Sequence, residues 1–395
     1  MAEGVAFYAP LKPPDHPVPS GDRRMARALM TAMEQTGRKV DLASRLRSFD
    51  RTGDRVRQQR MKRLGERVAD RLIEHYRTLP GDRRPKAWVT YHAYHKSPDW
   101  LGPQVRRALD IPYLLIETSF APKQAGGPWD LGHRATEAAV RGADLTLAMT
   151  GVDEAGLAPL VEPPGALRRL PPFLDPTPYR RAARERDSHR ADLAMRFGLD
   201  VDRPWLLAVA MMRDDVKRES YALLAQALRQ IQDRDWQILI VGDGPSRPSI
   251  ENLFAMLEPS RAIYAGILDQ DQLPACYAAA DVYAWPAIRE AYGMALLEAQ
   301  ASGLPVVAGR EGGVTDVVQD GVTGMLTQPR DPNALAVAIA DLLGHAAKRT
   351  AMSAAAQSFV DREHSLDHAA AMLDRALIDA SAILKARAHA QRALR

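Results

Sequence analysis

The sequence predicts an α/β protein with two domains, each built on a parallel β-sheet. Short apolar runs alternate with segments of helical periodicity along most of the chain, which is the pattern of parallel strands joined by crossover helices. The length of 395 residues favours two domains. Between residues 171 and 203 the sequence becomes rich in proline and arginine, which predicts a connector. We therefore expect an N-terminal domain over 1–175, a connector over 176–203 and a second domain over 204–363.

In the N-terminal domain, apolar runs predict strands and the segments between them predict helices. The helix over 55–76 is amphipathic, with Met61, Leu64, Val68 and Leu72 on one face. Its many arginines favour a solvated face over a membrane contact. The predicted strands are 5–8, 39–43, 88–94, 113–116 and 145–149, and the predicted helices are 22–35, 55–76, 102–109 and 132–141.

The second domain repeats the same alternation. Asp331 and Pro332 supply an N-cap and a first-turn proline for a helix over 333–343. Residues 364–395 are Ala-rich, helix-periodic and increasingly basic, which predicts a terminal helix. The predicted strands of this domain are 205–212, 237–241, 261–265, 282–285 and 305–308.

The composition excludes several classes of protein. The one cysteine, Cys276, rules out an intrachain disulfide and any Cys-based metal cluster, and it favours the reducing cytoplasm. No apolar stretch is long enough for a membrane span, and the first residues lack the pattern of a secretory signal. The net charge of +4 is too small to indicate nucleic-acid binding. Residues 1–200 hold 34 Lys and Arg against 25 Asp and Glu, whereas the remainder holds 19 against 24, so the halves differ in charge.

The most informative segment contains two glutamates, Glu290 and Glu298, separated by seven residues. A helix is expected to begin between them, and its first backbone N–H groups, near Gly293, Met294 and Ala295, would form a seat for an anion. Two carboxylates flanking an anion seat suit a nucleotide sugar, with hydroxyl groups at both ends and a pyrophosphate between. Two glutamates at this spacing are also common on solvated surface helices. If the spacing is considered alone, a solvated surface helix is the favoured interpretation.

Further sequence blocks surround this pair of glutamates. In this order and at close to this spacing they resemble the C-terminal signature of family 4 glycosyltransferases, over about residues 204–345. The resemblance implies the GT-B fold, in which two Rossmann-like, doubly wound α/β domains face a central cleft and the C-terminal helix, here 364–395, crosses back to the N-terminal domain. The blocks are LLAVAMM, ILIVGDGPSRPSIENL, YAGILDQDQLPACYAAADVYAWPA, ASGLPVVAG, EGGVTDVV and DGVTGMLTQPRDP.

The resemblance assigns roles to individual residues of the second domain. It implies that Glu298 binds the ribose hydroxyls of the donor and that Glu290 binds a hydroxyl of the donor sugar. It also implies that Arg213 and a basic residue after it bind the donor phosphates. Cations there would stabilise the negative charge that develops on the leaving phosphate.

The basic residue after Arg213 departs from the family pattern. The family spaces its Arg and Lys five apart with a glycine following, whereas here Lys217 is four residues on, Arg218 is five on, and no glycine follows. Lys217 is the preferred second phosphate-binding residue, and Arg218 stays open as the alternative. Ile267, just after Gly266, aligns with the loop that binds the nucleotide base of the donor in the family.

The N-terminal domain resembles the family only in plan. The loop that binds acceptor in the family corresponds to residues 19–22, where Gly21 allows a ligand to approach the backbone. Period-two alternation places His92 and His95 on opposite strand faces, which argues against a two-histidine metal site. A histidine at the carboxyl end of a strand faces the crevice where α/β sheets bind ligands, so either is a candidate site histidine, and His92 is preferred. A satisfied structural histidine is the equally weighted alternative.

The family also carries a histidine after the next strand, where this chain reads Glu117-Thr118-Ser119. That departure makes Glu117, together with Lys123 and Trp129, a candidate for acceptor binding.

We expect neither a metal nor a cofactor. Asp269 and Asp271 match an Asp-x-Asp metal motif only superficially, because they precede an apolar helix that an aspartate would N-cap. Cys276 lies within that apolar helix and is expected in the core.

The resulting prediction is a retaining, metal-independent glycosyltransferase, cytoplasmic, with a nucleoside-diphosphate sugar as donor. The acceptor would be a hydroxyl group of a glycan, a lipid-linked sugar or a small molecule, and a peripheral contact with the inner membrane face stays open. The base, the sugar, the linkage and the oligomeric state are not predicted. The alternatives are a sugar-nucleotide epimerase or phosphorylase on the same fold and a non-catalytic nucleotide-sugar binding protein.

Overall fold

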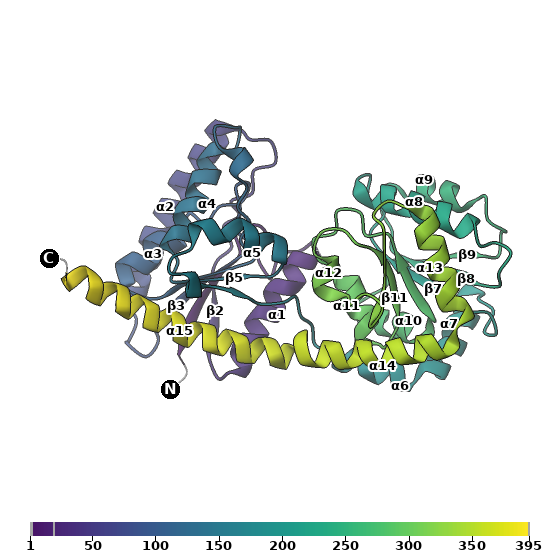
Figure 1. Ribbon diagram of the computed structural model, residues 1–395. Coiled ribbons are helices and arrows are strands. Elements are labelled where there is room, and N and C mark those ends of the chain that lie inside the picture. Colours follow the sequence, from purple (N-terminus) through teal and green to yellow (C-terminus); the bar gives the residue numbers. More distant parts are fainter. Residues whose placement is uncertain (1–2, 19, 394–395) are drawn as a thin grey trace. The chain divides into compact units, whose positions relative to one another are not determined.

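Each half of the chain folds around one six-stranded parallel sheet (Figure 1). The structure, a computed structural model, describes residues 3–18 and 20–393. The first unit comprises Met1–Pro171 and Leu366–Arg395, and the second comprises Pro172–Ser365. Among the described residues, no helix combines the length and the apolar character that crossing a membrane requires.

The sheet of the first unit has the strand order β2-β1-β3-β4-β5-β6. The order reverses once, because the chain moves outward from β1 to β2 and then returns to place β3 on the other side of β1. Loops that leave the carboxyl ends of β1 and β3 therefore diverge, and in open α/β sheets ligands bind at such a point. The strands are β1 (Gly4–Tyr8), β2 (Lys39–Ser44), β3 (Pro85–Tyr91), β4 (Tyr113–Ile116), β5 (Leu145–Ala148) and β6 (Leu167–Arg169).

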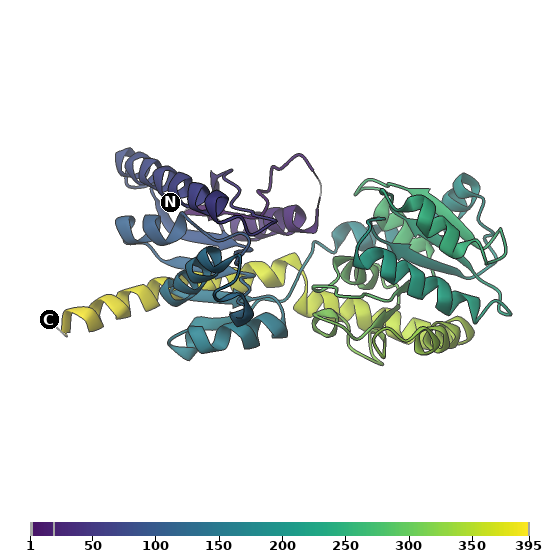
Figure 2. The same ribbon diagram turned by 90° about the horizontal axis from the view of Figure 1, so that it is seen from above.

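Helices cover both faces of this sheet. On one face, α1 (Gly21–Gln35) packs against α15 (Leu366–Ala393), which also contacts β4 and β5. Figures 1 and 2 both show α15 running along the first sheet. On the other face lie α2 (Arg55–Thr78), α3 (Gly102–Leu109) and α4 (Asp130–Gly142). The shorter helices of this unit are α5 (Gly151–Leu157) and the 3₁₀ turns Pro122–Gln124, Ala158–Leu160 and Pro164–Ala166.

A buried carboxylate fixes α15 to the first sheet. Asp144 directly precedes β5 and its side chain is fully buried. It accepts hydrogen bonds from Arg106 of α3 (2.8 Å), from Arg387 of α15 (3.2 Å) and from the backbone N–H of Tyr113 (2.9 Å). Two guanidinium groups and one amide therefore compensate one buried charge, which is the condition under which such a charge is tolerated.

The sheet of the second unit has the order β12-β11-β10-β7-β8-β9, and its reversal lies between β7 and β10. Figure 1 shows α8, α9 and α13 on one side of this sheet and α10, α11 and α14 on the other. The strands are β7 (Trp205–Val209), β8 (Gln237–Val241), β9 (Ala262–Gly266), β10 (Val282–Trp285), β11 (Val306–Gly309) and β12 (Gly324–Thr327). The helices are α8 (Val216–Arg229), α9 (Arg247–Phe254), α10 (Leu273–Ala279), α11 (Met294–Ala301), α12 (Val314–Val317), α13 (Pro332–Gly344) and α14 (Ala346–Glu363).

The segment expected as a connector over 176–203 is instead part of the second unit. It forms α6 (Thr177–Arg184) and α7 (Arg186–Phe197), which pack on α10. Arg186 and Arg190 of α7 bind Asp281, at 2.7 and 3.1 Å, and Asp281 also accepts from the N–H of Trp205 (2.8 Å). Two of the arginines that suggested a connector thus anchor α7 to Asp281.

The expected terminal helix over 364–395 begins two residues later, because α14 ends at Glu363 and α15 starts at Leu366. His364 between them is buried, and its Nδ1 lies 2.6 Å from the carbonyl oxygen of Pro172. The N–H of Leu174 donates to the carbonyl of His364 at 3.0 Å. The beginning and the end of the second unit are therefore hydrogen-bonded to each other.

We predict that Asp144→Ala destabilises the protein by about 3–5 kcal/mol, because two partly buried guanidinium groups lose their fully buried partner. Urea unfolding followed by tryptophan fluorescence measures the change. Asp41→Ala is the matched control, since its ion pair with Lys39 is exposed and such pairs contribute about 0–1 kcal/mol. Equal unfolding midpoints for the two variants would contradict this role of Asp144.

Candidate functional site

The reversal of strand order in the second sheet brings two loops together. One loop follows β7 and leads into α8, and the other follows β10 and leads into α11. In open α/β sheets, ligands bind outside the carboxyl ends of the strands at such a point. Arg213, Lys217 and Arg218 come from the first loop and helix, and Glu290 comes from the second loop.

Lys217 and Glu290 form the central contact of this site. The Lys217 Nζ donates to Glu290 Oε2 at 2.5 Å, and the two side chains are only 16% and 19% exposed. The same Nζ lies 5.5 Å from the ring centroid of Trp285, at the end of β10. Asp215 caps α8 by accepting from the N–H of Lys217 (2.8 Å), which fixes the base of the lysine side chain.

The other two cations are more exposed. Arg213 Nε lies 3.2 Å from Asp215 Oδ2, and Arg218 Nε lies 2.9 Å from Asp214 Oδ1. Both arginine side chains are about half exposed, so these pairs are weak and exchange readily. Each of the three cations has a carboxylate partner. An anionic ligand that binds these cations must therefore displace the carboxylates.

The backbone that carries Glu290 is tightly constrained. Ala287 and Arg289 have left-handed φ angles of 59° and 50°, which non-glycine residues rarely adopt. Gly312 also has a positive φ, and a Cβ atom there would lie 2.1 Å from the Glu290 carbonyl oxygen. Close packing against a glycine thus holds the Glu290 loop in an unusual conformation.

Helix α11 begins where the sequence predicts an anion seat. Gly293 precedes the helix with a φ of 76°, and a Cβ there would lie 2.8 Å from the side chain of Leu296. Met294 and Ala295 form the first turn, whose N–H groups have no acceptor within an α-helix. These amides are the expected anion donors, four and five residues beyond Glu290.

Glu298 is buried, with only 2% of its surface exposed. Its Oε2 accepts a hydrogen bond from the hydroxyl of Tyr277 in α10, at 2.7 Å. Burial, reinforced by the negative charge of Glu298, raises the pKa of Tyr277 well above its ordinary value, so the phenol stays protonated as a donor. The sequence pattern did not single out Tyr277, which appears there only as one apolar residue of the α10 stretch.

Ile267 follows β9 directly and is 78% exposed. Because β8, β9 and β7 are parallel neighbours, Ile267 lies at the same edge of the sheet as Lys217 and Glu290. An exposed apolar side chain at this edge provides a surface on which a flat ring can pack.

In the first unit, His92 also follows a strand at the reversal point. Strand β3 ends at Tyr91, and His92 has a left-handed φ of 58°. The expected strand to residue 94 is therefore wrong, and alternation does not determine where His92 and His95 point.

Two carboxylates face His92. Its Nδ1 lies 3.0 Å from Asp22 Oδ1 and 3.7 Å from Glu117 Oε1. Asp22 belongs to the first turn of α1, next to Gly21, and Glu117 follows β4. Asp22 directly follows the candidate Gly21, and this position is the signal by which the sequence could have identified Asp22 as a site residue. Pro19 of the same predicted loop lies outside the described residues.

The electrostatics of this cluster favour a charged histidine. Burial alone would lower the pKa of His92, but the negative charges of Glu117 and Asp22 raise it to about 9. Burial raises the pKa of Glu117 despite the charge of His92. Near neutral pH, His92 is thus a hydrogen-bond donor and carries a positive charge.

The remaining candidates of the first unit have structural contacts. Trp129 donates its Nε1–H to the carbonyl of Asp50 at 3.0 Å and lies under Lys96, whose Nζ is 4.5 Å from the ring centroid. Burial, together with the nearby charge of Lys96, lowers the pKa of His95 to about 4. Among the described residues, neither Trp129 nor Lys123 forms a hydrogen bond, ion pair or ring contact with His92.

Asp269 and Asp271 precede α10, but the residue at the N-cap position is Gln272, so the expected aspartate cap is wrong. Across the described residues, no group of three or more His, Cys, Asp or Glu side chains has an arrangement that could hold a metal ion. Cys276 is buried in the core, as expected.

Comparisons with known proteins find glycosyltransferases. A family model described as "Glycosyl transferases group 1" matches residues 203–345. A GDP-mannose-dependent alpha-(1-6)-phosphatidylinositol monomannoside mannosyltransferase from Mycolicibacterium smegmatis is 32% identical over 54% of this chain and 56% of its own length. A D-inositol 3-phosphate glycosyltransferase from Salinispora tropica is 34% identical over 43% of this chain and 38% of its own length. The chain thus matches about half the length of these relatives, or less.

Solved structures resemble the whole chain. A glycosyltransferase from Rickettsia africae matches with a TM-score of 0.74 at 14% identity. The match covers 96% of this chain and 98% of the Rickettsia chain. The Anabaena protein HepE, in complex with UDP and glucose, has a TM-score of 0.67 at 16% identity, over 94% of this chain and 98% of its own. These likenesses confirm the fold class: α/β with two doubly wound parallel sheets, of the GT-B type.

We predict that His92 makes the stability of the protein depend on pH. Its pKa of about 9 lies above the ordinary value of 6.5, so its contribution is fully present below pH 6.5 and is lost as pH rises through 9. Each pKa unit corresponds to about 1.4 kcal/mol. Urea unfolding at a series of pH values measures this loss.

His92→Gln should unfold with a flatter pH profile across this window than the wild type. His75→Gln, at an exposed position on α2, is the control and should retain the wild-type profile. A His92→Gln profile parallel to the wild type would refute the charged cluster.

Proposed function

Because residues 203–345 belong to the group 1 glycosyl transferases, we propose that the protein is a retaining glycosyltransferase that uses a nucleoside-diphosphate sugar. The observation that carries this proposal is the contact of Lys217 with Glu290 beside the first turn of α11. It places a cation, a carboxylate and helix N–H groups together at the reversal point of the second sheet.

The donor is proposed to lie along this edge of the second unit. Its diphosphate would be bound by the N–H groups of Met294 and Ala295 and by the side chains of Lys217 and Arg213. Glu290 would accept hydrogen bonds from the sugar hydroxyls, and the base would pack near Ile267.

Glu298 is proposed to bind the ribose. Since it is buried and bonded to Tyr277, the ribose must reach its carboxylate by insertion beside α11. The Tyr277 hydroxyl would then orient the carboxylate for the ribose diol, and Tyr277 would act as a positioning residue.

In the proposed reaction, the acceptor oxygen bonds to the anomeric carbon while the bond from that carbon to the phosphate oxygen breaks. The acceptor proton passes to the departing nucleoside diphosphate. Negative charge grows on the leaving phosphate as the bond breaks, so Lys217 and Arg213 stabilise the transition state more than the ground state.

We propose GDP-mannose as the donor to test first. The mannosyltransferase relatives from Mycolicibacterium smegmatis and Mycobacterium tuberculosis are named for GDP-mannose, whereas HepE was solved with UDP and glucose. The relatives' sequence identity of 30% or more, against 16% for HepE, favours the guanosine donor. A UDP-sugar is the alternative outcome of the same assay.

The first unit is proposed to bind the acceptor. His92, positively charged and held by Asp22 and Glu117, would donate a hydrogen bond to an acceptor oxygen or to a phosphate on the acceptor. Gly21, beside Asp22, would let the acceptor approach the backbone. In this assignment His92 is a hydrogen-bond donor and not a general base.

We predict that Lys217→Met lowers kcat by at least about 10²-fold, because charge on the leaving phosphate loses its buried cation. Arg218→Met should lose less than about threefold, because the Arg218 side chain is half exposed and held by Asp214. Steady-state release of nucleoside diphosphate measures both. Equal losses would assign the phosphate contact to Arg218 as well, and wild-type rates in both variants would refute the assignment.

We predict that Glu298→Gln weakens GDP binding by roughly tenfold, because an amide replaces the charged acceptor of the ribose hydroxyls. The amide keeps the size of the buried side chain, so the fold should persist. Glu258→Gln, which precedes the amino end of β9, is the control and should bind GDP as the wild type does. Calorimetric titration measures both, and unchanged affinity in Glu298→Gln would place the ribose elsewhere.

A further inference from the structure

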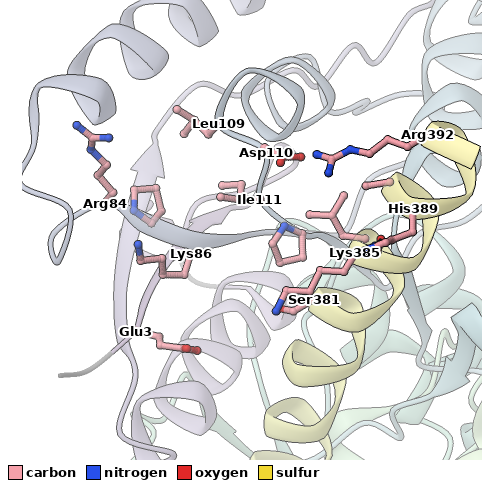
Figure 3. Close-up of a pocket in the computed structure, with 14 residues that line it drawn as sticks. Glu3, Arg84, Lys86, Leu109, Asp110, Ile111, Ser381, Lys385, His389 and Arg392 are labelled. Atoms are coloured by element: carbon pink, nitrogen blue, oxygen red, sulfur yellow. The ribbon is translucent and has the colours of Figure 1, made fainter. Parts of the chain in front are cut away.

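The first unit contains a cavity that the proposed reaction does not use. It has a volume of about 610 Å³ and lies where β3 and β4 begin, with α15 as its other wall (Figure 3). His92 follows the carboxyl end of β3, so the whole strand separates the two places. This cavity is therefore distinct from the edge of the sheet at which the reaction is proposed.

Basic side chains reach this cavity from separate elements. Lys86 extends from β3, and Lys385 and Arg392 extend from α15, which is 300 residues distant in the sequence. Two carboxylates, Glu3 and Asp110, also line it. Figure 3 shows the guanidinium of Arg392 directed toward Asp110, whereas the two lysines lie on the side away from that carboxylate.

The two lysines are available to a ligand. Within residues 3–18 and 20–393, no hydrogen bond or ion pair engages the ammonium group of Lys86 or Lys385. Arg84 differs, because its guanidinium already donates to the backbone carbonyls of Leu79 and Arg77, at 2.9 and 2.6 Å. Figure 3 shows Arg84 directed away from the cavity. The ligand charge would thus be met mainly by Lys86 and Lys385.

The wall between these charges is apolar. Ile111 and Pro112, which precede β4, and Pro85, at the start of β3, are buried and line the cavity. An apolar wall beside ammonium groups excludes part of the water that would otherwise screen them, which strengthens their attraction for an anion. An exposed lysine on a flat surface gains no such advantage.

We propose that this cavity binds a phosphate-bearing ligand, with the phosphate held by Lys86 and Lys385. A phosphate presents several acceptor oxygens and up to two charges, which matches two ammonium groups that have three donors each. Asp110 repels the phosphate from the other side of the cavity and would accept hydrogen bonds from hydroxyl groups attached to it. The phosphate could belong to a molecule in solution or to a phospholipid headgroup.

The experiment uses the full-length protein with two probes. Inorganic phosphate is titrated by calorimetry, and vesicles of phosphatidylcholine with and without phosphatidylglycerol are tested by co-sedimentation. Lys86→Glu and Lys385→Glu alter the cavity. Arg375→Glu, exposed on the same α15 but outside the cavity, changes the net charge by the same amount and is the matched control. Because all three side chains are exposed, folding should persist, and thermal unfolding verifies it.

We expect both lysine variants to bind the effective probe roughly tenfold more weakly than the wild type, and Arg375→Glu to bind normally. Loss with inorganic phosphate assigns a soluble ligand, and loss only with phosphatidylglycerol vesicles assigns a headgroup. Absence of binding to both probes, or equal weakening in Arg375→Glu, would overturn the proposal. The assay uses no sugar donor, so its result is independent of the proposed transferase activity.

Discussion

The strand order of each sheet reverses once, and the position of that reversal determines which side chains meet. In the second sheet it lies between β7 and β10, so the loop carrying Arg213 and the loop carrying Glu290 open toward each other. In the first sheet it lies between β1 and β3, which brings Asp22 beside His92. Neither meeting depends on local sequence alone, because parallel strands place residues distant in the chain at one edge.

Two kinds of ion pair serve different purposes in this framework. Asp144 and Asp281 each precede a strand, each accept two arginines and one backbone amide, and each fix a helix to its sheet. Removing one partner of such a buried cluster is costly, so the helix position is well defined. The pair of Arg213 with Asp215 is half exposed and exchanges easily. The buried clusters therefore lie where strands begin, whereas the half-exposed pair of Arg213 lies beside the more buried pair of Lys217 with Glu290, where a ligand is expected.

The sequence predicted the fold class and most elements, because continuous apolar runs and helical periodicity are local signals. The short strands β6 and β12 were not predicted, since LRR and GMLT carry little apolar pattern and depend on neighbouring strands. The pairing of Lys217 with Glu290 and the bond from Tyr277 to Glu298 join residues 73 and 21 positions apart. Such contacts follow from sheet topology, so motifs identified both glutamates and Lys217, but neither Tyr277 nor the two contacts themselves.

The contacts that hold Lys217 bear on how the proposed site would work. Glu290 and the capped start of α8 hold the ammonium group in place, so little reorganisation would be needed when charge develops nearby. The same contact must weaken when a phosphate arrives, and Glu290 must then find other donors. Sugar hydroxyls are such donors, because they can hydrogen-bond to the carboxylate that Lys217 releases. A ligand with both a phosphate and hydroxyl groups satisfies both partners of the separated pair, whereas a bare phosphate would leave Glu290 without its cation. In the proposed site, this requirement would favour a sugar phosphate over a simple anion.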